Sequence, residues 1–230
     1  MKTLGIIGGL GPMAMAYFVQ LVTEYTDVKR DQDHIPIVLI SIPDTPDRTK
    51  YILGESDENP LPRLVDAGLK LKKMGAEFIA IPCVTAHYFY KQLKEQIGIP
   101  VVSLPCELSA ELNSNGIDKV GILATSGTIE SGFIQRKLNN EGIETILPTQ
   151  DEQKIVMKVI YEQIKAGKQP DVNAFLEIGN SLKKRGAQKL LLGCTELSLI
   201  KRDYRDRIGK DYLDVLEVLA IAAVRNCTKE

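Results

Sequence analysis

The sequence has no large excess of charge of either sign and no low-complexity segment. Its 230 residues include 29 lysines and arginines against 30 aspartates and glutamates, a net charge of −1, and 44% of the residues are hydrophobic. This balance excludes a disordered polyelectrolyte and the basic surface of a nucleic-acid-binding protein. A folded protein that binds a small molecule is the class that remains.

Cysteine is scarce. The four cysteines stand far apart, at positions 83, 106, 194 and 227. This low density excludes a disulfide scaffold and indicates reduced thiols in a cytoplasmic protein.

Long apolar runs are also missing. The apolar segment 4–7 follows Lys2 and superficially resembles a secretory signal peptide, but glycines and a proline interrupt it within residues 8–12. We therefore expect a buried strand that enters a glycine-rich turn and then a helix. No other stretch is long and apolar enough to cross a membrane.

An internal repeat is the most informative feature that is present. Residues 64–83 recur as residues 175–194 with seven identical positions, and both copies end on a cysteine. Each copy has the pattern of a helix, a Gly-Ala pair and an apolar run of strand length. A weaker similarity joins the starts of the two halves, around Gly5 and Gly121. The duplication predicts two α/β lobes, each with a thiol just beyond a buried strand.

Short apolar runs alternate with helical patterns throughout the chain. We expect strands at 4–7, 37–42, 78–82, 99–104, 120–124, 143–147 and 189–192. This alternation is typical of parallel sheets flanked by helices. We therefore predict an α/β protein of two pseudo-symmetric lobes, with the active site in the cleft between them.

The lobe boundaries follow from the same pattern. We expect residues 1–107 and 211–230 to form the N-terminal lobe, and residues 108–210 to form the C-terminal lobe. The last apolar stretch, 213–224, has helical spacing and is expected to pack on the first lobe.

Two of the cysteines are the strongest functional candidates. Ligands of open α/β sheets bind beyond the carboxyl ends of the strands, and Cys83 and Cys194 follow equivalent strands. Polar residues come shortly after each cysteine: Thr85 and His87 in the first half, Thr195 and Glu196 in the second. A lone cysteine is ordinarily an inert buried thiol, but its repetition favours function. Cys106 and Cys227 have no counterpart and are interpreted as structural or incidental.

Metal binding and dinucleotide binding are weaker interpretations. Cys83 and His87 lack a second close pair of ligands, so no metal site is predicted. The glycine turn matches a dinucleotide fingerprint only loosely, because Ala14 replaces the last glycine and Pro12 removes a helix donor. We prefer a turn at Gly11 whose backbone N–H groups approach a carboxylate, with a plain tight turn as the alternative.

Several candidates also have ordinary structural interpretations. Thr85 and Thr195 stand where threonine commonly caps a helix. His87 is either a satisfied helix residue or a catalytic support. Arg48 lies in a predicted loop, where a solvated surface role is usual, and Lys165 ends a predicted helix, where it offsets the helix dipole.

Seven segments carry a resemblance to a known family: GIIGGLGP, KRDQDHIP, PDRT, PCVTAHYF, ATSGT, IYEQIKAG and LGCTEL. Over its whole length the chain resembles the aspartate/glutamate racemase superfamily, and the aspartate racemase branch most closely. The glutamate racemase branch usually has histidine where Glu196 stands, and the Asp-Ser pair found early in that branch is missing.

The resemblance implies an amino-acid racemase without a cofactor or a metal, most closely an aspartate racemase. It implies a homodimer with no nucleic-acid or membrane partner. Cys83 and Cys194 would act on opposite faces of the substrate's α-carbon, one removing a proton and the other delivering one. Substrate contacts are implied for residues at matching positions: Gly11, Arg48, Thr85, Thr128, Lys165, Thr195 and Glu196. Among these, Arg48 and Lys165 are suited to the substrate's side-chain carboxylate.

Three departures from the family's motifs bear on the substrate: Val84 in place of asparagine, Ile42 in a segment usually rich in asparagine, and Val215 after Asp214. They leave open a racemase with the same mechanism but a less acidic or broader range of substrates. A binding protein that has lost efficient chemistry is a further alternative, against which the two intact thiols argue.

Overall fold

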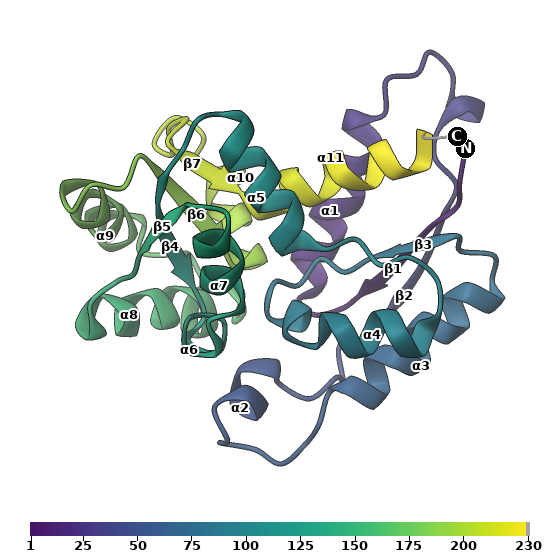
Figure 1. Ribbon diagram of the computed structural model, residues 1–230, viewed down its shortest axis with the longest axis horizontal. Coiled ribbons are helices and arrows are strands. Elements are labelled where there is room, and N and C mark those ends of the chain that lie inside the picture. Colours follow the sequence, from purple (N-terminus) through teal and green to yellow (C-terminus); the bar gives the residue numbers. More distant parts are fainter. Residues whose placement is uncertain (229–230) are drawn as a thin grey trace. The chain divides into compact units, whose positions relative to one another are not determined.

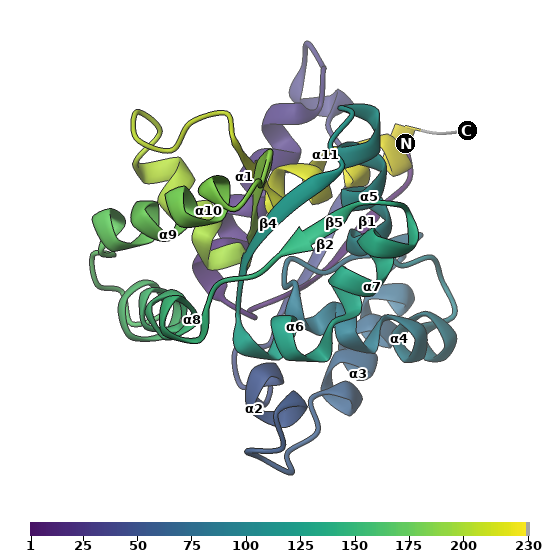
Figure 2. The same ribbon diagram turned by 60° about the vertical axis from the view of Figure 1, so that its left-hand side comes forward.

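The computed structural model describes residues 1–228, which form two compact units (Figures 1 and 2). Unit 1 comprises Met1–Leu104 and the segment from Leu216 onward, and unit 2 comprises Pro105–Val215. We had expected the two boundaries after residues 107 and 210. None of the helices in the described part of the chain has the length and apolar character needed to cross a membrane.

Unit 1 contains a parallel three-stranded sheet in the order β2-β1-β3. Its strands are β1 (Leu4–Gly8), β2 (Ile37–Ser41) and β3 (Phe78–Ala80). All five residues of β1 are buried, as expected for a central parallel strand. The register pairs Gly8 with Ser41, and β3 pairs in parallel with β1, so the carboxyl ends of all three strands lie at one edge. The N-terminal apolar run is therefore a strand, as predicted.

The helices of unit 1 cover both faces of this sheet (Figures 1 and 2). They are α1 (Pro12–Tyr25), η1 (Asp31–Asp33), α2 (Arg48–Ile52), α3 (Leu61–Lys73), η2 (Thr85–Phe89), α4 (Tyr90–Ile97) and α11 (Val215–Thr228). Helices α3 and α4 lie together on one face, and α1 and α11 lie on the other. The core on the α3 side includes Ile7, Leu71, Ile79 and Leu93.

The predicted strand at 99–104 is wrong. Only Val101 forms an isolated bridge, with Ile79, and the helix α5 begins at Leu104. Pro105 explains the change, because proline favours the first turn of a helix and cannot donate to a strand ladder.

Unit 2 contains a parallel four-stranded sheet in the order β5-β4-β6-β7. Its strands are β4 (Lys119–Ala124), β5 (Glu144–Ile146), β6 (Lys189–Gly193) and β7 (Tyr212–Asp214). The register pairs Ala124 with Gly193, and Leu192 with Asp214, so β4, β6 and β7 end together. Strand β7 was not predicted, because its three residues run directly into the apolar pattern of α11.

The helices of unit 2 are α5 (Leu104–Ser114), α6 (Ser126–Ser131), α7 (Phe133–Asn140), α8 (Gln150–Met157), η3 (Lys158–Ile164), α9 (Val172–Lys184) and α10 (Thr195–Asp203). Helices α8 and α9 contact each other and pack on β4, and α9 also contacts β6. The core between them and the sheet includes Leu123, Phe175, Leu190 and Leu192.

The internal repeat of the sequence is a repeat of structure. Helices α3 and α9 each have 13 residues, and each buries a glycine against its own unit. A Cβ on Gly68 would lie 2.3 Å from Ile97, and one on Gly179 would lie 2.2 Å from the hydroxyl of Tyr212. A side chain at either position would force these neighbours to shift, so glycine permits the close approach of the helix.

Candidate functional site

Cys194 starts helix α10 at the carboxyl edge of the unit 2 sheet. It follows Gly193, the last residue of β6, and occupies the N-cap position with an extended backbone, φ −141° and ψ 133°. The interpretation of Thr195 as the cap is wrong, because Cys194 occupies the N-cap position and Thr195 is the first helical residue. The thiol is thus held where the strand ends and the helix begins.

Glu196 links the thiol to a lysine. The Cys194 thiol donates a hydrogen bond to Oε2 of Glu196 at 2.9 Å, and the Thr195 hydroxyl donates to the same oxygen at 3.3 Å. The other carboxylate oxygen, Oε1, lies 2.7 Å from Nζ of Lys165. The Glu196 side chain is 5% exposed and that of Lys165 23%. Both oxygens of a buried carboxylate are therefore satisfied.

The protonation states follow from these contacts. Burial and the neighbouring Glu196 carboxylate raise the pKa of Cys194 well above its usual value, against the opposing Lys165 ammonium. Burial also acts to raise the pKa of Glu196, but the Lys165 charge and the hydrogen bonds from Cys194 and Lys165 hold that pKa below its usual value. At neutral pH the site holds a thiol, a carboxylate and an ammonium.

A π-helix positions Lys165, which follows its last residue. The segment η3 continues α8 with π-helical geometry, and the backbone N–H of Lys165 donates to the carbonyl of Ile160, five residues earlier, at 3.0 Å. The ammonium also lies 5.5 Å from the ring centroid of Tyr161. Such π-helical turns are rare and frequently occur at functional sites. The residue pattern predicts only a helix that ends at Lys165 and does not indicate π-helical geometry.

Thr128 lies at the same sheet edge, after β4. Thr125 caps helix α6, accepting a hydrogen bond from the backbone N–H of Thr128 at 3.3 Å, and the two hydroxyl oxygens are 3.2 Å apart. Thr128 is fully buried. Its hydroxyl therefore helps to fix the turn after β4.

Ser198 and Asp214 are a pair at this edge that sequence reasoning did not assign to the site. The Ser198 hydroxyl, one turn along α10 from Cys194, donates to Oδ1 of Asp214 at 2.5 Å, and both residues are fully buried. Asp214 ends β7 beside β6. The sequence signals were the family motif that includes Asp214 and the apolar residues around this aspartate.

The loops after β1 and β2 of unit 1 are joined by Arg48. Its guanidinium donates to the backbone carbonyls of Leu10 at 3.0 Å, Pro46 at 3.0 Å and Thr45 at 3.2 Å. Arg48 is only 8% exposed, so the interpretation as a solvated surface group is wrong. Gly11 is the N-cap of α1, next to the carbonyl that Arg48 binds. Gly11 and Arg48 are thus brought into one loop cluster.

Cys83 lies beyond the third strand of the same sheet. A tight turn follows β3, in which the backbone N–H of Cys83 donates to the carbonyl of Ile81 at 2.8 Å. The Nε2 atom of His87 lies 3.2 Å from that carbonyl. Burial lowers the pKa of His87 to about 4, so the ring is neutral at neutral pH. Cys83 and His87 are therefore tied to the same carbonyl.

Thr85 begins the short helix η2. The residue before it, Val84, is the N-cap, and no side chain caps this helix, so the capping role considered for Thr85 is wrong. Both Val84 and Thr85 are buried. Helix η2 also contacts α2, where Arg48 lies, and the rings of Tyr51 and Phe89 are 5.8 Å apart.

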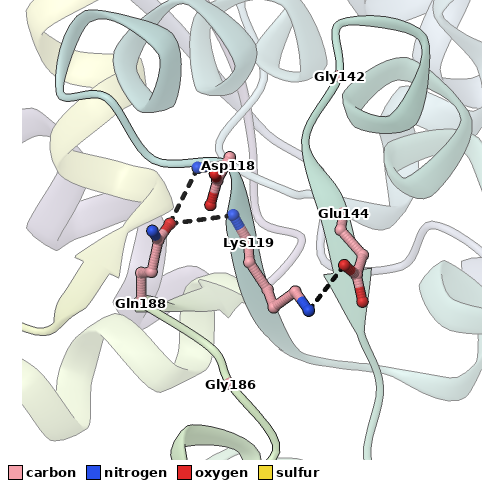
Figure 3. Close-up of a pocket in the computed structure, with 6 residues that line it drawn as sticks. All are labelled: Asp118, Lys119, Gly142, Glu144, Gly186 and Gln188. Atoms are coloured by element: carbon pink, nitrogen blue, oxygen red, sulfur yellow. Dashed lines mark hydrogen bonds and ion pairs between the residues drawn. The ribbon is translucent and has the colours of Figure 1, made fainter.

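A polar depression lies at the opposite, amino-terminal edge of the unit 2 sheet. It measures about 530 Å³, and Figure 3 shows its six lining residues. Lys119 reaches Glu144 at 2.7 Å, and Oε1 of Gln188 accepts from the backbone N–H groups of Asp118 and Lys119 (Figure 3). These contacts hold the first residues of β4 to β5 and to the residue before β6, so we assign them a structural role.

Within residues 1–228, no three histidine, cysteine, aspartate or glutamate side chains are grouped so as to hold a metal ion.

Comparison with known families finds a match over most of the chain. Residues 7–223 match the Asp/Glu/hydantoin racemase family. The chain therefore belongs to this family.

Solved structures of the family resemble the whole chain. The aspartate racemase of Picrophilus torridus is 30% identical, with a TM-score of 0.82, over 100% of this chain and 96% of that one. A putative Asp/Glu racemase from Yersinia pestis has the same TM-score at 24% identity, over 100% of both chains, and shares the fold.

Curated relatives match over shorter segments. The broad-specificity amino-acid racemase RacX of Bacillus subtilis is 30% identical over 148 residues, which are 62% of this chain and 63% of that protein. Glutamate racemase of Aquifex pyrophilus is 26% identical in an alignment that covers 66% of this chain and 59% of that protein. These two matches each span less than two thirds of the relative's length.

Proposed function

We propose that the protein is an amino-acid racemase, acting on aspartate, with Cys83 and Cys194 as its two acid–base groups. The observation that carries the proposal is the structural duplication, in which each copy of the helix–strand repeat leads to a cysteine at the carboxyl end of its sheet. The whole-length similarity to an aspartate racemase supports the choice of substrate.

The proposed reaction needs two proton carriers. One thiolate removes the α-proton and becomes a thiol, and the electron pair of the broken C–H bond stays on the substrate as a carbanion with enediolate character. The other thiol gives its proton to the opposite face and becomes a thiolate. A single group tends to return the proton to the same face with retention. The mechanism requires that both thiols reach one α-carbon.

The negative charge that develops on the substrate must be stabilised by the protein. Helix α10 begins directly after Cys194, so the first backbone N–H groups of this helix lie beside the thiol. Such groups favour anions, so they are suited to the α-carboxylate as charge grows on it. Thr85, Thr128 and Thr195 are proposed to assist.

The substrate's side-chain carboxylate is assigned to Arg48 and Lys165. Both are cations at the carboxyl edge of their sheet, each already fixed by contacts within its own unit. Fixed cations cost little reorganisation when an anion arrives. We also propose, from the family resemblance, that Gly11 borders the substrate, that the protein is a cytoplasmic homodimer and that it uses no cofactor.

A second candidate is the same chemistry on a broader range of amino acids. The observation that favours it is Val84, a buried apolar residue beside Cys83 where the family usually has a polar amide. The similarity to a broad-specificity racemase agrees with it. A panel of L-amino acids, each assayed for formation of the D enantiomer, distinguishes the two candidates. An aspartate racemase turns over aspartate far faster than any other amino acid.

The decisive experiment is hydrogen exchange during catalysis. The reduced protein is incubated with L-aspartate in D₂O, and the α-proton signal and D-aspartate are followed by NMR and chiral chromatography. We expect both exchange and D-aspartate, with racemisation lost by roughly 10³-fold or more in Cys83→Ser and in Cys194→Ser. The matched control is Cys106→Ser, an exposed cysteine, which should retain the wild-type rate.

Two results would contradict the proposal. Absence of exchange in the wild type would remove aspartate racemisation, and the amino-acid panel would then decide between another substrate and a binding role. Racemisation that survives in either single variant would remove the two-thiol mechanism.

A further inference from the structure

The hydrogen bond between Cys194 and Glu196 has a direction. A carboxylate can only accept, so the proton in the 2.9 Å contact lies on the sulfur. The carboxylate is fixed by Lys165 at 2.7 Å on its other oxygen. These three groups are in unit 2, and Cys194 and Glu196 are 5% and 4% exposed. The charged groups that act on the thiol are Glu196 and Lys165.

This arrangement is unusual for a cysteine at the start of a helix. A helix N-terminus ordinarily favours the thiolate, which makes such a cysteine easier to ionise. Here a neighbouring carboxylate opposes ionisation by charge repulsion and by accepting a hydrogen bond from the protonated thiol. A carboxylate that served only to pair with Lys165 would not need its second oxygen on the sulfur.

We propose that Glu196, held in place by Lys165, is a positioning residue that keeps the proton on Cys194, so that Cys194 is the proton donor of the resting enzyme. The inference rests on the racemase function proposed above. In the donating step the S–H bond of Cys194 breaks, and its proton forms a C–H bond with the electron pair of the carbanion. The thiolate that remains lies beside the Glu196 carboxylate. Repulsion between them favours return of a proton from the next substrate or from water.

The test reads the ionisation of Cys194 directly. The rate of alkylation by iodoacetamide is measured against pH by mass spectrometry of the tryptic peptide 190–201, in which Cys194 is the only cysteine. The Glu196→Gln variant removes the charge but keeps the size of the side chain. In this variant the pH midpoint of Cys194 alkylation is expected to fall by about one pH unit or more. In Glu196→Asp, which keeps the charge at a greater distance, it should fall less.

A matched control removes a similar ion pair elsewhere in unit 2. Glu144→Gln breaks the 2.7 Å pair with Lys119 at the opposite edge of the sheet and should leave the Cys194 midpoint unchanged (Figure 3). The peptide 95–119, with Cys106 as its only cysteine, is the internal reference in every digest. Melting temperatures confirm that each variant is folded.

The pH dependence of racemisation is a second test of the inference. If Cys194 must be protonated to donate, the alkaline limb of kcat/KM should move to lower pH in Glu196→Gln, by the same amount as the alkylation midpoint. Equal midpoints in the wild type, Glu196→Asp and Glu196→Gln would overturn the inference while the racemase function stands. A wild type that racemises no amino acid would overturn the donor role, whatever the midpoints.

Discussion

The Nε2 atom of His87 lies 3.2 Å from the carbonyl oxygen of Ile81. A carbonyl only accepts, so Nε2 carries the proton. The buried Nδ1, which has no hydrogen-bond partner among residues 1–228, is the unprotonated nitrogen. The same carbonyl accepts the backbone N–H of Cys83. His87 therefore supports the turn before Cys83 as a neutral ring and does not bring a positive charge to the thiol at neutral pH.

The first prediction concerns this buried ring and pH. Burial lowers the pKa of His87 from 6.5 to about 4, so the unfolded chain takes up the proton first as pH falls. The free energy of unfolding should therefore decrease between pH 6.5 and 4, by about 3 kcal/mol at most from this residue, and His87 should add no pH dependence above that range. Urea unfolding at pH 7.5, 6 and 5 measures the decrease. His87→Gln should flatten it.

The control for this prediction is the other histidine. His34 is only partly buried, so His34→Gln should keep the wild-type decrease between pH 6.5 and 4. If His87→Gln and the wild type lose stability in parallel, the ring is not held neutral by burial and the assignment of its tautomer fails with it.

The second prediction concerns Arg48. Its guanidinium binds three backbone carbonyls of two loops, so Arg48→Met should leave buried acceptors without this donor and cost about 2–4 kcal/mol of unfolding free energy. Arg63→Met is the matched control, because Arg63 forms an exposed ion pair with Asp44 and should change stability by less than about 1 kcal/mol. Urea unfolding without substrate measures both. Equal stabilities would mean that Arg48 acts on a ligand only.

The sequence was sufficient to predict the α/β class and the paired cysteines. The repeat made this possible, because Gly68 and Gly179 each lie where a helix approaches its neighbours closely, and both copies lead to a thiol. Family motifs added Arg48 and Lys165. These features depend on local spacing, which a sequence carries directly.

Contacts between distant segments could not be predicted. The ion pair of Lys165 with Glu196 spans 31 positions and depends on a π-helical turn that has no recognisable residue pattern. The burial of Arg48 depends in part on one carbonyl, that of Leu10, from a loop 38 positions away. Both cations had been interpreted as surface or substrate groups, because a sequence shows that a residue is charged but not which partner the fold brings to it.

The third prediction compares the alkylation rates of two cysteines that have no role in the proposed reaction. Cys106 is exposed at the start of α5, whereas burial raises the pKa of Cys227 to about 12. Iodoacetamide at pH 8 should therefore label Cys106 at least about tenfold faster than Cys227 in the native protein, since the thiolate is the reactive form. Peptide mass spectrometry over time gives both rates. After unfolding in urea the two rates should converge, and a difference that persists there would be chemical rather than structural.

The fourth prediction separates backbone strain from steric contact at two glycines of unit 1. Gly9 and Gly54 both have positive φ, 87° and 72°, so alanine is strained at either by about 1 kcal/mol. At Gly54 an added Cβ meets nothing within 4 Å, but at Gly9 it would lie 2.5 Å from the backbone nitrogen of Ile42, which cannot move without disturbing its 3.0 Å bond to Gly8. Gly9→Ala should therefore cost more than about 3 kcal/mol of unfolding free energy, and Gly54→Ala only about 1 kcal/mol. If urea unfolding shows equal losses of unfolding free energy in the two variants, the loop after β2 can shift away. The glycine turn would then not fix the loop that carries Arg48.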